Sequence, residues 1–167
     1  VAALCAIVAV TLATRSFVTN DQAGTLVLCG GGLEFSGEHL EVADALHDLA
    51  RSLKSEGRPA KLASMHSGAA TEKAARLVWD GEPNDPGYYD LFSKLDFQPS
   101  FVPLAPDNYL TVASDPRWVK EVDEADAVFL NGGDQIRHTR ALMRDDGGDS
   151  PLLEAIRRLL RRGGTVI

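Results

Sequence analysis

Two adjacent glycines, followed by side chains that form hydrogen bonds, are the part of this sequence best suited to chemistry. Gly132 and Gly133 come after an apolar run at 127–130, and Asp134 and Gln135 follow them. Because glycine has no β-carbon, it lets a ligand approach the backbone N–H groups closely. Such N–H groups can stabilise an oxyanion or bind a phosphate. The same motif is also typical of a plain turn between a strand and a helix.

The elements around this motif follow from the periodicity of apolar residues. A buried run with no polar alternation predicts a strand of a parallel sheet, and Asp134 is expected to cap a helix over 135–143. Apolar patterns typical of strands and of helices alternate along the rest of the chain. The other expected strands are 25–29, 60–65, 99–104 and one beginning at 165–167, and the other expected helices are 38–56, 71–79, 88–95, one that Ser114 caps and one that Ser150 caps.

Strands that alternate with helices predict an α/β fold, a three-layer sandwich with a mostly parallel sheet, because parallel strands need crossover connections. The carboxyl ends of parallel strands meet at one edge of such a sheet. The polar residues that follow the strands are therefore expected to converge there. Their ranges are 30–34, 64–67, 107–109 and 131–135. The Gly- and Pro-rich stretch 81–87 is expected to be a surface insertion.

Composition excludes several classes of protein. The chain has 167 residues, of which 44% are hydrophobic, enough for one globular domain with a core. A net charge of −7 argues against a nucleic-acid binder, and the arginines at 157–162 are expected on a solvated helix face. Two cysteines make no disulfide framework, and Cys29 is expected to be a packed core thiol.

No cofactor or metal is expected from the motifs. The glycines at 30–32 do not complete a dinucleotide fingerprint, because Phe35 occupies the last required position, and there is no P-loop. The four histidines lack the spacing of zinc ligands. His66 alone follows a strand in a way that indicates a site, although a histidine that caps a turn explains its position better.

The first residues differ from the rest. Residues 1–14 are apolar and uncharged, and this run is too short to span a membrane. We expect 1–23 to be the remnant of a signal peptide with a linker, and 24–167 to belong to one α/β domain. Export to the periplasm or the outside follows, with no stable membrane association after cleavage of the signal. A signal anchor or an ordinary apolar helix is the alternative.

A family resemblance rests on residues 25–32, 128–139 and 151–167, and its most specific part is the motif at 129–137, Phe-Leu-Asn-Gly-Gly-Asp-Gln-Ile-Arg. Weaker similarity covers almost everything after Gly24, except the insertion at 81–87. These stretches resemble the cyanophycinase branch of the S51 serine peptidases, whose fold is flavodoxin-like and similar to that of class I glutamine amidotransferases. The resemblance implies that Gly132 and Gly133 form the turn on the oxyanion side. It also implies that Asp134, Gln135 and Arg137 contact the substrate.

In that family a Gly-Thr-Ser-Ala-Gly nucleophile elbow follows the next strand, and this sequence reaches Ile167 where the elbow is expected to begin. The chain is therefore expected to be an amino-terminal part of the domain, incomplete at the carboxyl end. The catalytic serine, histidine and acidic partner are expected beyond Ile167, and the 167 residues alone are expected to be inactive. The implied substrate is an aspartate-containing peptide, such as the β-aspartyl-arginine polymer.

Two other interpretations stay open at this point. The first is a noncatalytic α/β domain that uses the Gly-Gly-Asp-Gln rim to bind a small ligand. The second is a relative of the glutamine amidotransferases with cysteine at the elbow. No interpretation includes a nucleic-acid partner, a metal or an organic cofactor, and a homo-oligomer is compatible with all of them.

Overall fold

A mostly parallel sheet forms the middle layer of the molecule. The structure is a computed structural model, and it describes residues 8–10, 24–29, 40–54, 57–83 and 85–167. Within these ranges the main sheet has six strands in the order β1-β2-β8-β7-β3-β6. Every neighbouring pair is parallel except β1 with β2. The strands are β1 (Val8–Val10), β2 (Thr25–Leu28), β3 (Ala60–Met65), β6 (Phe97–Val102), β7 (Ala127–Leu130) and β8 (Thr165–Val166).

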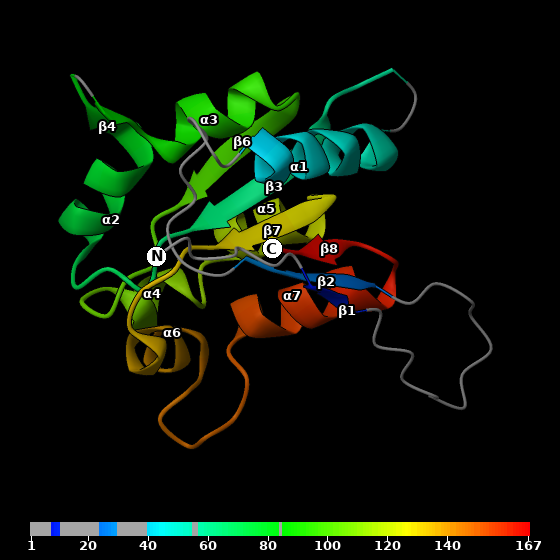
Figure 1. Ribbon diagram of the computed structural model, residues 1–167. Helices are drawn as coiled ribbons and strands as arrows, with labels where there is room; N and C mark the ends of the chain where they lie inside the picture. Colours follow the sequence, from blue (N-terminus) through cyan, green and yellow to red (C-terminus); the bar gives the residue numbers. More distant parts are fainter. Residues whose placement is uncertain (1–7, 11–23, 30–39, 55–56, 84) are drawn as a thin grey trace.

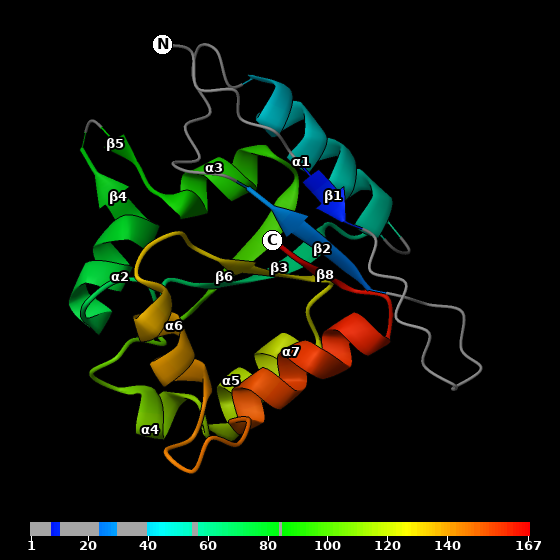
Figure 2. The same ribbon diagram turned by 60° about the horizontal axis from the view of Figure 1, so that its bottom comes forward.

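Helices cover both faces of this sheet, as the two views show (Figure 1). In Figure 2, α1 and α3 lie on one side of the strands, and α5 and α7 lie on the other. The described helices are α1 (Leu40–Leu53), α2 (Glu72–Asp80), α3 (Tyr88–Lys94), α4 (Tyr109–Val112), α5 (Pro116–Asp123), α6 (Gln135–Leu142) and α7 (Pro151–Arg161). The predicted three-layer α/β fold is thus confirmed, and it is consistent with a flavodoxin-like arrangement.

Strand β7 contributes side chains to the hydrophobic cores on both faces of the sheet. Successive side chains of a strand point to opposite faces, so an apolar run in a parallel sheet supplies two cores. Phe129 packs in the core beneath α1 and α3, together with Leu46 and Phe92. Val128 packs in the other core with Leu159 of α7. Burial on both faces explains why the run at 127–130 carries no polar residue.

Several predicted boundaries differ from the structure, and two of these differences have a clear cause. The strand expected at 99–104 begins two residues earlier, at Phe97, because β6 pairs in register with β3 from Ala60 to Met65. Pro99 lies inside this strand, which is tolerated because β6 is at the edge of the sheet. The cap of α5 is Asp115, not Ser114, since the Asp115 carboxylate accepts a hydrogen bond from the Arg117 N–H.

Four short elements were not expected. Helix α4 precedes α5, and β4 (Gly81–Glu82) pairs with β5 (Asp85–Pro86) in a small hairpin within the expected insertion. Val8–Val10 forms β1, antiparallel to β2. The rest of 1–23 lies outside the described residues, so the signal peptide stays a prediction. Within the part that is described, no helix is both long and apolar enough to cross a membrane.

The arginines of α7 lie at the surface, as expected, but most have partners. Arg158 makes two hydrogen bonds to the Asp123 carboxylate of α5, at 2.9 and 2.8 Å. Arg157 pairs with Asp149, and Arg162 donates to two backbone carbonyls at the end of α5. These contacts fasten α7 to its neighbours.

Candidate functional site

The loops that follow β3 and β7 meet at the carboxyl edge of the sheet. The two strands are parallel neighbours, so their last residues end side by side. The Asn131 N–H donates to the Met65 carbonyl at 3.1 Å, and the Gly68 N–H donates to the Asn131 side-chain oxygen at 3.3 Å. The expected convergence of 64–67 with 131–135 is confirmed. Asp107 instead accepts from Glu72 at the start of α2, and 30–34 lie outside the described residues.

The Gly132-Gly133 turn is exposed and lies against Gly68. Gly133 has a φ of 139°, a conformation that favours glycine. A β-carbon there would lie 3.1 Å from the Gly68 carbonyl oxygen, and one at Gly68 would lie 2.8 Å from the Gly132 oxygen. A β-carbon at Gly132 would meet nothing within 4 Å. The two loops therefore approach each other more closely than side chains would allow.

The N–H groups of this turn are available to a ligand. Neither the Gly132 nor the Gly133 N–H donates a hydrogen bond within the described ranges. Unpaired N–H groups at an exposed glycine turn are suited to an anion or to an oxygen that gains negative charge during a reaction.

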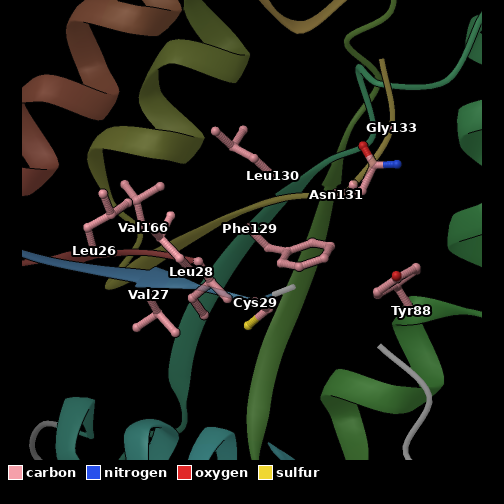
Figure 3. Close-up of a pocket in the computed structure, with 12 residues that line it drawn as sticks. Leu26, Val27, Leu28, Cys29, Tyr88, Phe129, Leu130, Asn131, Gly133 and Val166 are labelled. Carbon is pink, nitrogen blue, oxygen red and sulfur yellow. The ribbon is translucent and has the colours of Figure 1, made fainter. Parts of the chain in front are cut away.

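The turn forms one end of a cavity of about 560 Å³. Ile167 lines the same cavity, because its backbone continues the pairing of β8 with β7: its N–H donates to the Val128 carbonyl at 2.8 Å and its carbonyl accepts from Leu130 at 2.9 Å. Figure 3 shows Asn131 and Gly133 at one end of β7, with Leu26 and Val166 toward the other. The lining residues are Leu26, Val27, Leu28, Cys29, Tyr88, Phe129, Leu130, Asn131, Gly132, Gly133, Val166 and Ile167.

The walls of the cavity are mostly apolar. Tyr88 of α3 and Phe129 of β7 stand 5.1 Å apart between ring centres, and Cys29 lies on the same side of the cavity (Figure 3). Burial raises the pKa of Tyr88, and Cys29 adds to this rise. Cys29 packs beside the core, as expected, but it also faces the cavity. The cavity can hold an apolar group next to the N–H groups of the turn.

The three side chains expected to bind substrate belong to the cap and the first turn of α6. Asp134 caps this helix by accepting from the Ile136 N–H at 2.8 Å, as the sequence predicted. Arg137 donates to the Gly68 carbonyl at 3.2 Å and lies 3.6 Å from Asp134. Gln135 is exposed. Asp134 and Arg137 thus hold the rim of the site together, and Gln135 presents its amide to solvent.

His66 does not cap a turn with its side chain, which corrects that expectation. The ring is fully buried, 2.9 Å from the Ser64 hydroxyl oxygen, and its Nδ1 has no partner within the described residues. Aromatic rings surround it, the nearest being Tyr88 at 5.1 Å between centres. Burial, and to a smaller degree the nearby His138, lower the pKa of His66 to about 4. A neutral histidine here has a packing role.

His138 is the residue of this site that sequence reasoning missed. It lies on α6, where its Nδ1 is 2.7 Å from the Ser67 hydroxyl and its Nε2 is 2.8 Å from the Asn131 carbonyl oxygen. The signal for it is spacing: His138 follows the helix cap Asp134 by four residues, so it returns to the face that meets the strand ends. In the described part of the chain, no group of three or more histidine, cysteine and acidic side chains is arranged to hold a metal.

Comparisons with known proteins bear on the fold. No protein-family model matches the chain. No curated protein matches it either. Among solved structures, it is similar to a peptidase from an acI-B1 Actinobacterium, with a TM-score of 0.58 and 21% sequence identity over 86% of this chain. This likeness shows that the two proteins share a fold. The chain spans about half of that protein, since the match covers 52% of its length.

Proposed function

We propose that this chain is the amino-terminal part of a cyanophycinase-like serine peptidase of the S51 type that hydrolyses aspartate-containing peptides. The observation that carries the proposal is that the exposed Gly132-Gly133 turn and Ile167 line one cavity. A residue that follows Ile167 would emerge next to the unpaired N–H groups of the turn. The fold shared with a peptidase supports the same reading.

In the proposed reaction, a serine that follows Ile167 attacks the carbonyl carbon of the scissile bond. A histidine takes the serine proton and passes it to the leaving amine, and water then hydrolyses the acyl-enzyme. The N–H groups of Gly132 and Gly133 donate to the carbonyl oxygen as it becomes negative. Loss of one such donor costs about 3–4 kcal/mol of transition-state stabilisation. The glycine turn therefore contributes to rate without a reactive side chain.

The rim at the start of α6 is proposed to bind the peptide. Gln135 is exposed there and can both donate to and accept from peptide groups. Arg137 uses one guanidinium nitrogen for the Gly68 carbonyl, and the other donors of a guanidinium suit a substrate carboxylate. Asp134 suits a cationic group such as the guanidinium of a β-aspartyl-arginine unit. We also propose that the protein is exported, on the basis of the apolar run at 1–14.

The test uses the protein extended by the residues that follow Ile167 in its coding sequence. We expect a serine in a Gly-x-Ser-x-Gly elbow there, release of dipeptides from the β-aspartyl-arginine polymer, and loss of turnover when that serine is changed to alanine. Labelling by a fluorophosphonate should follow the same pattern. Unchanged turnover in the alanine variant would reject the mechanism. A stop codon after Ile167 would favour the noncatalytic binding domain.

A further inference from the structure

His138 joins the two loops of the site through a short polar chain that the proposed reaction does not use. Its ring lies between the Ser67 hydroxyl, at 2.7 Å, and the Asn131 backbone carbonyl, at 2.8 Å. Ser67 is fully buried, so it cannot reach a substrate. The chain of contacts therefore needs a role other than nucleophilic attack.

The partners of His138 determine which ring nitrogen carries hydrogen. A carbonyl oxygen can only accept, so Nε2 must donate to Asn131. In a neutral ring Nδ1 is then an acceptor, and the Ser67 hydroxyl must donate to it. Burial favours this neutral ring by lowering the pKa of His138, although the Asn131 carbonyl and the Asp134 charge oppose that change. Each of the three groups thus has one orientation.

The hydrogen bond to Asn131 also acts on the next residue. The Asn131 carbonyl and the Gly132 N–H belong to the same peptide group, which is planar and trans. In a trans peptide the carbonyl and the N–H point in opposite directions. Because His138 holds the carbonyl toward α6, the Gly132 N–H must point away from that helix. Asn131 and Gly132 both line the cavity, and the N–H has no partner within the described ranges.

We propose that His138 is a positioning residue that sets the direction of the Gly132 N–H through the Asn131 peptide group. The N–H then points to one place before any ligand arrives, which is what an anion-accepting turn requires. The direction of the Gly132 N–H does not depend on what the protein does. Its importance for catalysis rests on the proposed peptidase function. Two measurements separate these two statements.

The first measurement is made on the 167-residue chain by NMR. In the unmodified protein, ¹⁵N shifts of the His138 ring should show hydrogen on Nε2, and the residual dipolar coupling of Gly132 should fit an N–H that points away from α6. His138→Leu should change this coupling, whereas His138→Gln should restore it, because the glutamine amide can donate in place of Nε2. Ser67→Ala is the matched control, since it removes one hydrogen bond but leaves the bond to Asn131.

The results decide the proposal even if His138→Leu does not fold. Hydrogen on Nδ1 in the unmodified protein would overturn it. An equal change of the Gly132 coupling in Ser67→Ala and in His138→Leu would also overturn it. If His138→Leu is unfolded, the deciding variant is His138→Gln. A Gly132 coupling in that variant that differs from the coupling in the unmodified protein would then overturn the proposal.

The second measurement is peptide hydrolysis by the protein extended beyond Ile167. His138→Leu should lower kcat by about tenfold to a hundredfold with KM nearly unchanged, because a misdirected donor acts mainly in the transition state. His138→Gln should recover most of that loss. Equal kcat in all variants would overturn the catalytic part. Absence of hydrolysis in the unmodified extended protein would reject the peptidase function and leave the NMR result to stand on its own.

Discussion

Gly132 and Gly133 occupy the same turn but differ in what a side chain would meet there. Gly133→Ala places a β-carbon at a positive φ and 3.1 Å from the Gly68 oxygen, so we expect it to lower the free energy of unfolding by about 1–3 kcal/mol. Gly132→Ala adds a β-carbon in open space and should change stability little. Urea denaturation of both variants measures this, and equal losses would contradict the described geometry.

His66 should make stability depend on pH. Its pKa is about 4 in the folded chain and about 6.5 in an unfolded one. Between these values the unfolded chain binds a proton that the folded chain does not, so the free energy of unfolding falls as the pH decreases. We expect His66 to lower the free energy of unfolding by about 3 kcal/mol between pH 6.5 and pH 4. Urea denaturation at several pH values measures this change.

The control for this prediction is His66→Phe, which keeps a ring among the surrounding aromatic residues. The free energy of unfolding of this variant should depend less steeply on pH over the same interval, whatever its value at neutral pH. His138, whose pKa is also lowered by burial, contributes to the slope that remains. The same slope in both proteins would exclude His66 as the titrating group.

At the scale of elements, two neighbouring helices allow a matched test of capping. The Ser150 hydroxyl accepts from the Leu153 N–H at 3.2 Å and is buried at the start of α7. Ser150→Ala should therefore cost about 1 kcal/mol of stability. Ser114→Ala is the control, since Asp115 caps α5 and Ser114 is exposed. Thermal unfolding measures both, and an equal effect would contradict the assignment of the caps.

The elements that could be predicted are those whose signals are local. The bounds of β3 and β7 follow from apolar runs, and the start of α7 follows from a cap and a proline, so neighbours in sequence were sufficient. The four residues of α4 carry too little periodicity to be recognised. Strand β6 was shifted because its register depends on β3, which is far away in the sequence.

The same distinction between local and distant signals applies to the candidate site. The glycine turn and the Asp134 cap could be predicted, since a strand, two glycines and a cap lie within eight residues of sequence. The contacts of His138 with Ser67 and of Gly68 with Gly133 could not, because each joins loops that only the parallel pairing of β3 and β7 brings together.

At the scale of the whole molecule, the sheet should be unevenly stable. Strand β3 pairs over six residues with β6 and over four with β7, whereas β2 pairs over two residues with β8 and over three with β1. We expect amide hydrogens of β3 to exchange slowest and those of β2 to exchange much faster. Hydrogen-exchange mass spectrometry measures this, and equal protection of β2 and β3 would contradict the described pairing.

The position of β8 between β2 and β7 has a consequence for synthesis of the chain on the ribosome. Among the described strands, β8 alone links β2 to β7, yet it is translated after every other described strand. Leu26 and Val27 can therefore pair only with β1 until the residues up to Val166 have emerged. Nascent chains stalled before Thr165 should consequently be held by chaperones that recognise extended apolar segments.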